Sequence, residues 1–153
     1  MGGKSEILMI IAAIIMSVAL MLTVGPSINQ STNTPKYAVI NSEISNIKNA
    51  SALWIGANTT DGTYTGITAT GVQTYLPGLT LNASNELVSK VNTGITYVVG
   101  PKTGDATQLE ITVKGLTAVS GAETSVKNTQ TSLASTVTDT TANDGTLVFA
   151  YKG

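Results

Sequence analysis

The sequence predicts an α+β protein in which a long hydrophobic N-terminal helix, broken near Pro26, continues into an amphipathic helix packed on a small antiparallel β-sheet. Three observations predict this fold. The run from Ile7 to Val24 carries no charged residue. Apolar residues recur at helical spacing between Lys36 and Ile55. The second half of the chain holds short β-branched runs separated by turn-forming residues. We therefore expect an apolar transmembrane helix over residues 1–25, an extended linker over 26–35 and a globular head over 36–153.

The first apolar run is long enough to cross a membrane as a helix. At 1.5 Å per residue it measures about 27 Å, close to the roughly 30 Å hydrocarbon core of a bilayer. Lys4 and Glu6 precede it, and Gly25-Pro26 ends or kinks it. Three interpretations are open: a cleaved secretory signal, a single-pass anchor, or a stalk helix that later enters a filament core. Its length and the poor cleavage site at its end disfavour the signal.

A second helix is predicted after a polar stretch. Residues 27–34 are rich in Ser, Thr and Asn and form helices poorly, so they indicate a linker. Thr34-Pro35 has the residue types of a helix start, and Gly56 is a natural stop. Between them, apolar residues recur on one helical face, which we expect to pack against a sheet: Tyr37, Ile40, Ile44, Ile47 and Trp54.

The remaining chain predicts mostly short strands. Residues 67–76 could hold a short helix ending before Pro77, and residues 120–133 a second one, with Glu123 and Lys127 one turn apart. The stretch 132–146, rich in Ser, Thr and Asp, predicts an exposed loop. Strands are expected at residues 79–81, 95–99, 109–114 and 146–152.

The composition excludes most chemistry. The chain has no His, Cys or Arg, and its net charge is −1. A Ser-His-Asp triad, a Cys nucleophile and an ordinary zinc site are therefore impossible, and nothing indicates nucleic-acid binding. The nine acids are scattered, so we expect them on the solvated surface. Asp139 and Asp144 share a loop that could touch calcium, but they lack an EF-hand pattern. We predict no catalytic residue, no metal and no cofactor.

The start of the chain resembles a mature type IV pilin. The sequence Ser5-Glu6-Ile7-Leu8-Met9-Ile10-Ile11, followed by an apolar helix, is similar to that family, whose fifth mature residue is a Glu. Glu6 is sixth if Met1 is the first mature residue and fifth if Gly2 is the first. The predicted second helix is followed by Tyr64-Thr65-Gly66-Ile67 and then by Tyr75-Leu76-Pro77. This order of segments resembles that of the type IVb pilins of conjugative and toxin-coregulated pili. The resemblance covers roughly residues 1 to 100. Many type IVb pilins carry a C-terminal disulfide that this chain lacks.

This resemblance implies a non-enzymatic structural subunit, a major pilin of an extracellular pilus for conjugation or adhesion. Its expected partners are identical subunits in a helical homopolymer, the inner membrane before assembly, a prepilin peptidase and the pilus assembly machinery. The expected location is the inner membrane first and the cell-surface pilus later. A minor pilin or tip adhesin, and a membrane-anchored extracytoplasmic domain, are the alternatives. The residues that the resemblance assigns to filament assembly are Met1, Lys4, Glu6, Ile7, Ile10, Ile11, Ile14, Leu20 and Pro26.

Overall fold

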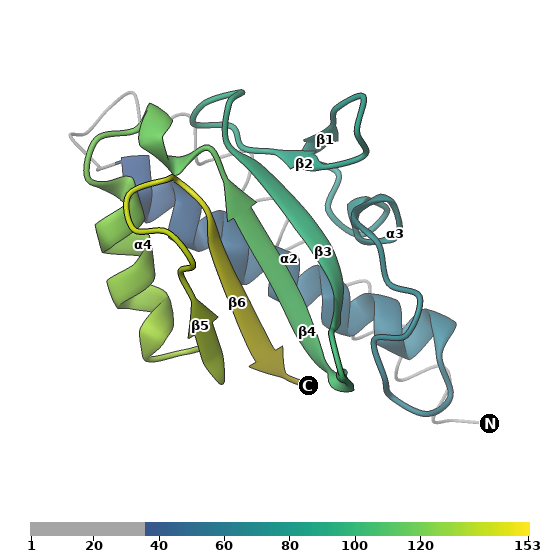
Figure 1. The fold of residues 1–153 in the computed structure, drawn as a ribbon. Helices are drawn as coiled ribbons and strands as arrows, with labels where there is room; N and C mark the ends of the chain where they lie inside the picture. Colours follow the sequence, from purple (N-terminus) through teal and green to yellow (C-terminus); the bar gives the residue numbers. More distant parts are fainter. Residues whose placement is uncertain (1–35) are drawn as a thin grey trace.

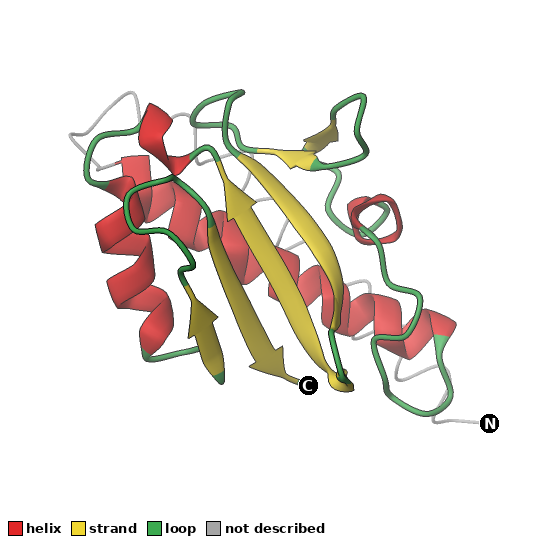
Figure 2. Ribbon diagram, viewed as in Figure 1, coloured by secondary structure: helices red, strands yellow, loops and turns green. Residues whose placement is uncertain are grey.

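A long helix crosses one face of a six-stranded antiparallel sheet in the computed structural model, which describes residues 36–153 (Figures 1 and 2). The helix, α2, spans Lys36–Asn58. The α+β prediction of a helix followed by an antiparallel sheet is confirmed. The apolar helix predicted over residues 1–25 and the linker over 26–35 lie outside the described residues.

The sheet has the strand order β1-β2-β3-β4-β6-β5, so the last strand is inserted between β4 and the short β5. Every pair of neighbours is antiparallel, with Tyr97 opposite Val113 and Ile111 opposite Phe149. The strands are β1 (Thr80–Leu81), β2 (Leu87–Val88), β3 (Thr96–Lys102), β4 (Asp105–Lys114), β5 (Thr136–Thr138) and β6 (Leu147–Lys152).

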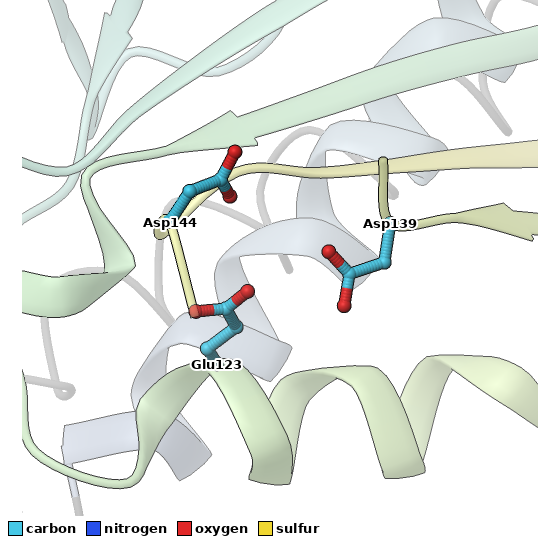
Figure 3. A group of neighbouring side chains, drawn as sticks. All are labelled: Glu123, Asp139 and Asp144. Carbon is cyan, nitrogen blue, oxygen red and sulfur yellow. The ribbon is translucent and has the colours of Figure 1, made fainter. Parts of the chain in front are cut away.

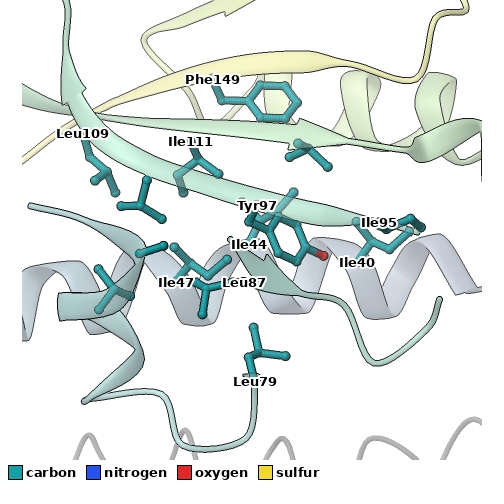
Figure 4. Close-up of a cluster of buried hydrophobic side chains, with 14 of the residues drawn as sticks. Ile40, Ile44, Ile47, Leu79, Leu87, Ile95, Tyr97, Leu109, Ile111 and Phe149 are labelled. Atoms are coloured by element: carbon teal, nitrogen blue, oxygen red, sulfur yellow. The ribbon is translucent and has the colours of Figure 1, made fainter. Parts of the chain in front are cut away.

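The core lies between α2 and the sheet. Along β4, Leu109, Ile111 and Val113 are buried while Glu110 and Thr112 are only half-buried, which is the alternation of a strand with one face in the core. Figure 4 shows Leu109 and Ile111 facing the isoleucines of α2. Burying an aliphatic side chain of this size contributes about 1.5–3 kcal/mol, so this layer supplies most of the driving force for folding.

Smaller helices border α2. The helix α3 (Ala69–Gln73) contacts α2 near the β1–β2 side of the sheet. The 3-10 turn η1 (Leu116–Ala118) leads to α4 (Ala122–Thr131), which contacts α2, β5 and β6. Figure 1 shows α4 at the β5 end of the sheet and α3 at the other end. The α2 helix is therefore enclosed on both flanks as well as on its sheet-facing side.

Two expectations about these elements need correction, and one strand was not predicted. Gly56 does not stop α2, which continues to Asn58. Side chains that follow the glycine satisfy two carbonyls that precede it, since Asn58 Nδ2 donates to Trp54 O at 3.0 Å and Thr59 Oγ1 to Ile55 O at 3.0 Å. The predicted 132–146 loop contains β5, whose Val137 packs on the core. The two-residue strand β2 was missed because it is too short to show a period. The four predicted strands fall within or overlap β1, β3, β4 and β6, and are confirmed.

No helix within residues 36–153 is both long enough and apolar enough to cross a membrane. The predicted membrane span lies in the part of the chain that the structure does not describe.

Two glycines in helices should respond in opposite ways to substitution by alanine. Gly56 is exposed and a Cβ there would meet nothing within 4 Å, whereas a Cβ at Gly71 would lie 2.8 Å from Trp54 Nε1. We expect Gly56→Ala to raise the free energy of unfolding by about 0.5–1 kcal/mol, through the helix propensity of alanine. We expect Gly71→Ala to lower it by about 1–3 kcal/mol through overpacking.

Denaturant unfolding of both full-length variants in detergent micelles measures this difference. Equal stabilisation by the two substitutions would show that the Trp54 indole does not depend on the space left by Gly71.

Candidate functional site

The contact surface between α2 and the sheet is the candidate functional site, because α2 is the first described element after the predicted N-terminal segment. Ile40, Ile44 and Ile47 are completely buried on it. Tyr37 and Trp54 are partly buried and pack against the same cluster. The structure therefore places all five residues of the predicted apolar face at the core. The residues predicted for filament assembly, from Met1 to Pro26, lie outside the described chain.

A buried carboxylate lies on one flank of the isoleucine row. Glu43 is 1% exposed, so the prediction that all acids are on the solvated surface is wrong at this position. Its Oε1 accepts hydrogen bonds from Ser89 Oγ at 2.6 Å and from Tyr97 OH at 2.6 Å. Its Oε2 accepts one from Lys90 N at 2.9 Å. These donors come from β3 and from the segment between β2 and β3, so one side chain joins α2 to two parts of the sheet.

The environment of Glu43 perturbs two titrating groups. Burial raises the pKa of the Glu43 carboxyl, and the hydrogen bonds from Ser89, Tyr97 and Lys90 oppose that increase only in part. Burial, and then the charge of Glu43, raise the pKa of the Tyr97 hydroxyl well above its usual value. Tyr97 therefore stays protonated and donates this hydrogen bond at neutral pH.

A second polar connection lies on the opposite flank of α2. Tyr151 OH on β6 donates to Gln130 Oε1 on α4 at 2.6 Å, and Gln130 Nε2 donates to Asn41 Oδ1 on α2 at 3.0 Å. The Lys48 ammonium lies 4.3 Å from the centre of the Tyr151 ring, a cation–π geometry. Burial raises the pKa of Tyr151, which keeps its hydroxyl protonated.

Together these contacts determine how α2 lies on the sheet. The isoleucine row would tolerate some sliding, because apolar contacts are not directional. The Glu43 and Gln130 contacts are directional, and a buried polar group left without its partner costs about 1–3 kcal/mol. Rotating α2 or shifting it by one turn would break both connections. The site can thus hold the N-terminal end of the head in one fixed orientation.

Sequence reasoning could have found Glu43 but not its partners. Glu43 lies three residues after Ile40 and four before Ile47, so it borders the apolar face. Ser89 and Tyr97 are 46 and 54 residues further along the chain, in segments with no distinguishing motif.

Comparison of the chain with protein-family models, with curated proteins and with solved structures finds no match.

The raised pKa of Glu43 predicts a specific pH dependence of stability. The folded chain prefers the protonated carboxyl, so the contribution of Glu43 is fully present below its ordinary pKa of 4.5 and is lost as the pH rises through the folded-state pKa. Glu43→Gln removes this titration. We therefore expect the free energy of unfolding of wild type to fall, relative to that of Glu43→Gln, as the pH rises above 4.5.

Urea unfolding of both proteins in detergent micelles, at about pH 4 and at about pH 7, provides the test. A relative gain in wild-type stability over that interval would mean that the hydrogen bonds outweigh burial and that the pKa is lowered. Glu110→Gln, at a half-buried position on β4, is the matched control.

Proposed function

We propose that this protein is the structural subunit of an extracellular filament, a type IVb-like major pilin that polymerises through its N-terminal hydrophobic helix. The observation that carries the proposal is the position of α2. This helix begins at residue 36, directly after the predicted apolar segment and linker, and lies in the core of the head. An N-terminal filament segment would therefore enter the head through the helix that packs across its sheet.

The sequence of the first 26 residues supports the same proposal. An uncharged run from Ile7 to Val24 would lie in the inner membrane before assembly and against identical segments afterwards. A dozen apolar side chains, each contributing about 1.5–3 kcal/mol on burial, would prevent release of the free subunit into water. Glu6 would pair with the N-terminal ammonium of a neighbouring subunit, because a carboxylate entering an apolar bundle needs a cationic partner.

A filament subunit must withstand a pulling force on its N-terminal segment, and the contacts of α2 with the rest of the head are suited to resist it. Tension on the N-terminal segment would act along α2, and the head would have to resist separation of α2 from the sheet. On one flank Glu43 is hydrogen-bonded to Ser89 and Tyr97 across that contact. On the other flank Asn41 is linked to Tyr151 of β6 through Gln130 of α4. Repeating one heterologous contact between identical subunits gives an open helical polymer rather than a closed ring. A prepilin peptidase and an assembly machinery would process and add the subunits.

Replacing Glu6 tests the proposed assembly. We expect Glu6→Ala to reduce the subunit recovered in sheared surface filaments by about tenfold or more, because a lost buried ion pair costs several kcal/mol. The subunit should instead accumulate in the membrane fraction. Immunoblots of the sheared and membrane fractions of the native host, with electron microscopy of the sheared material, measure both effects.

Glu6→Asp is the matched control, since it keeps the carboxylate, and it should retain more filaments than Glu6→Ala. Unchanged filament yield from Glu6→Ala would exclude the assembly role of Glu6. A chain found only in the membrane fraction, even as wild type, would indicate an anchored domain. A chain present in filaments only in trace amounts would indicate a minor pilin.

A further inference from the structure

Three carboxylates from distant parts of the sequence meet at the end of the head that carries α4. Glu123 lies in the first turn of α4, Asp139 directly follows β5, and Asp144 lies in the same loop before β6. One carboxylate oxygen from each lies within 4.8 Å of the other two. Figure 3 shows the three side chains converging on one region between α4 and the loop.

The charges in this cluster are not balanced by the contacts within it. Lys127 Nζ, on α4, lies 3.0 Å from Asp139 Oδ2 and forms an ion pair with it. Three carboxylates and one ammonium leave two formal negative charges. At separations of a few ångströms like charges repel strongly, and most strongly where a side chain is shielded from water. A divalent cation carries the charge that would neutralise the cluster.

Asp139 supplies an independent observation that points to a ligand. Its side chain is only 9% exposed, and its Oδ1 is buried and accepts no hydrogen bond from the described residues. In Figure 3 its carboxylate points toward Glu123. Buried carboxylate oxygens in folded proteins are almost always hydrogen-bonded or bound to a metal, because an unsatisfied one is costly. Asp139 thus has a buried oxygen without a hydrogen bond, on a carboxylate that faces the cluster.

The other two carboxylates are held in place by the loop. Glu123 Oε1 accepts from Asn143 N at 3.2 Å, and Glu123 Oε2 accepts from Gly145 N at 3.1 Å. Asp144 Oδ1 accepts from Thr146 N at 2.8 Å. Backbone donors of this kind orient the ligand carboxylates of metal sites without neutralising them. The cluster is therefore ordered before any ion binds.

We propose that Glu123, Asp139 and Asp144 bind one calcium ion. Ligand oxygens lie about 2.4 Å from calcium, so any two of them are at most about 4.8 Å apart, as observed here. Oxygen-only donors favour calcium, magnesium or manganese over zinc or copper. Calcium accepts several carboxylates in irregular geometry, with water or carbonyl oxygens completing its shell, whereas magnesium demands a near-ideal octahedron. This inference departs from the absence of metal expected from the sequence.

The proposed ion would connect α4 to the loop between β5 and β6. The chain has no cysteine, so this region has no covalent cross-link. An ion that binds only the folded chain stabilises it in proportion to the logarithm of its concentration. The inference rests on the folded head alone and does not depend on filament formation.

Calcium binding to the full-length protein in detergent micelles tests the proposal. After treatment with a chelator, equilibrium dialysis with radioactive calcium should show one ion per chain, with a dissociation constant of about 10⁻⁵–10⁻³ M. Magnesium should bind at least about tenfold more weakly. Adding about 10 mM calcium should raise the melting temperature by about 3 °C or more.

Two variants and a matched control make the assignment specific. Asp144→Asn changes an exposed side chain and keeps an oxygen for Thr146 N, so the head should fold normally. Asp139→Asn changes the buried ligand. Each should weaken calcium binding by about tenfold or more and abolish the thermal shift. Asp61→Asn, which removes an exposed carboxylate elsewhere, should bind calcium like wild type.

Three results would overturn the proposal. The first is that wild type binds no calcium below about 10 mM, a concentration higher than the dissociation constants of even weak extracellular calcium sites. Asp144→Asn and Asp139→Asn could both bind as tightly as Asp61→Asn. Equal affinity for magnesium and calcium would overturn the assignment of the ion as calcium.

Discussion

The burial of one carboxylate between a helix and a sheet constrains the whole head. Glu43 is enclosed by Ser89, Lys90 N and Tyr97, so α2, β3 and the end of β2 must meet at one point. A buried carboxyl group is tolerated only where hydrogen-bonding partners surround it, so this contact fixes the position of α2 on the sheet. The isoleucine row then packs in the register that Glu43 permits. The position of α2 sets where α3 and α4 can lie on its flanks.

The strand order also connects the C-terminal strand β6 to α2. Because β6 is inserted between β4 and β5, the last strand is internal to the sheet, and its Tyr151 reaches α2 through Gln130 and Asn41. The beginning and the end of the described chain are thereby joined in a domain without disulfides. The acidic cluster lies where the first turn of α4 meets the loop from β5 to β6. A calcium ion there would connect α4 to the loop that leads into β6.

Local patterns in the sequence predicted the helix and the main strands, because both depend on short-range periodicity. The spacing of Ile40, Ile44 and Ile47 and the alternation in β4 are of this kind. The polar partners could not be predicted, since Asn41 and Gln130 are 89 residues apart. In the acidic cluster, the sequence alone indicated that Asp139 and Asp144 share one loop. Nothing in the sequence indicated that Glu123 joins them, because only the folded arrangement brings α4 beside that loop.

A reconstruction by electron cryomicroscopy of sheared surface filaments tests the central claim most directly, namely that α2 joins an N-terminal filament segment to the head. The account predicts a filament of this chain in which residues 7–24 form a central helical bundle. It also predicts that α2 leads outward from the bundle with Glu43 still hydrogen-bonded to Tyr97. A filament whose axis is built from paired head sheets, with residues 7–24 outside the core, would contradict it.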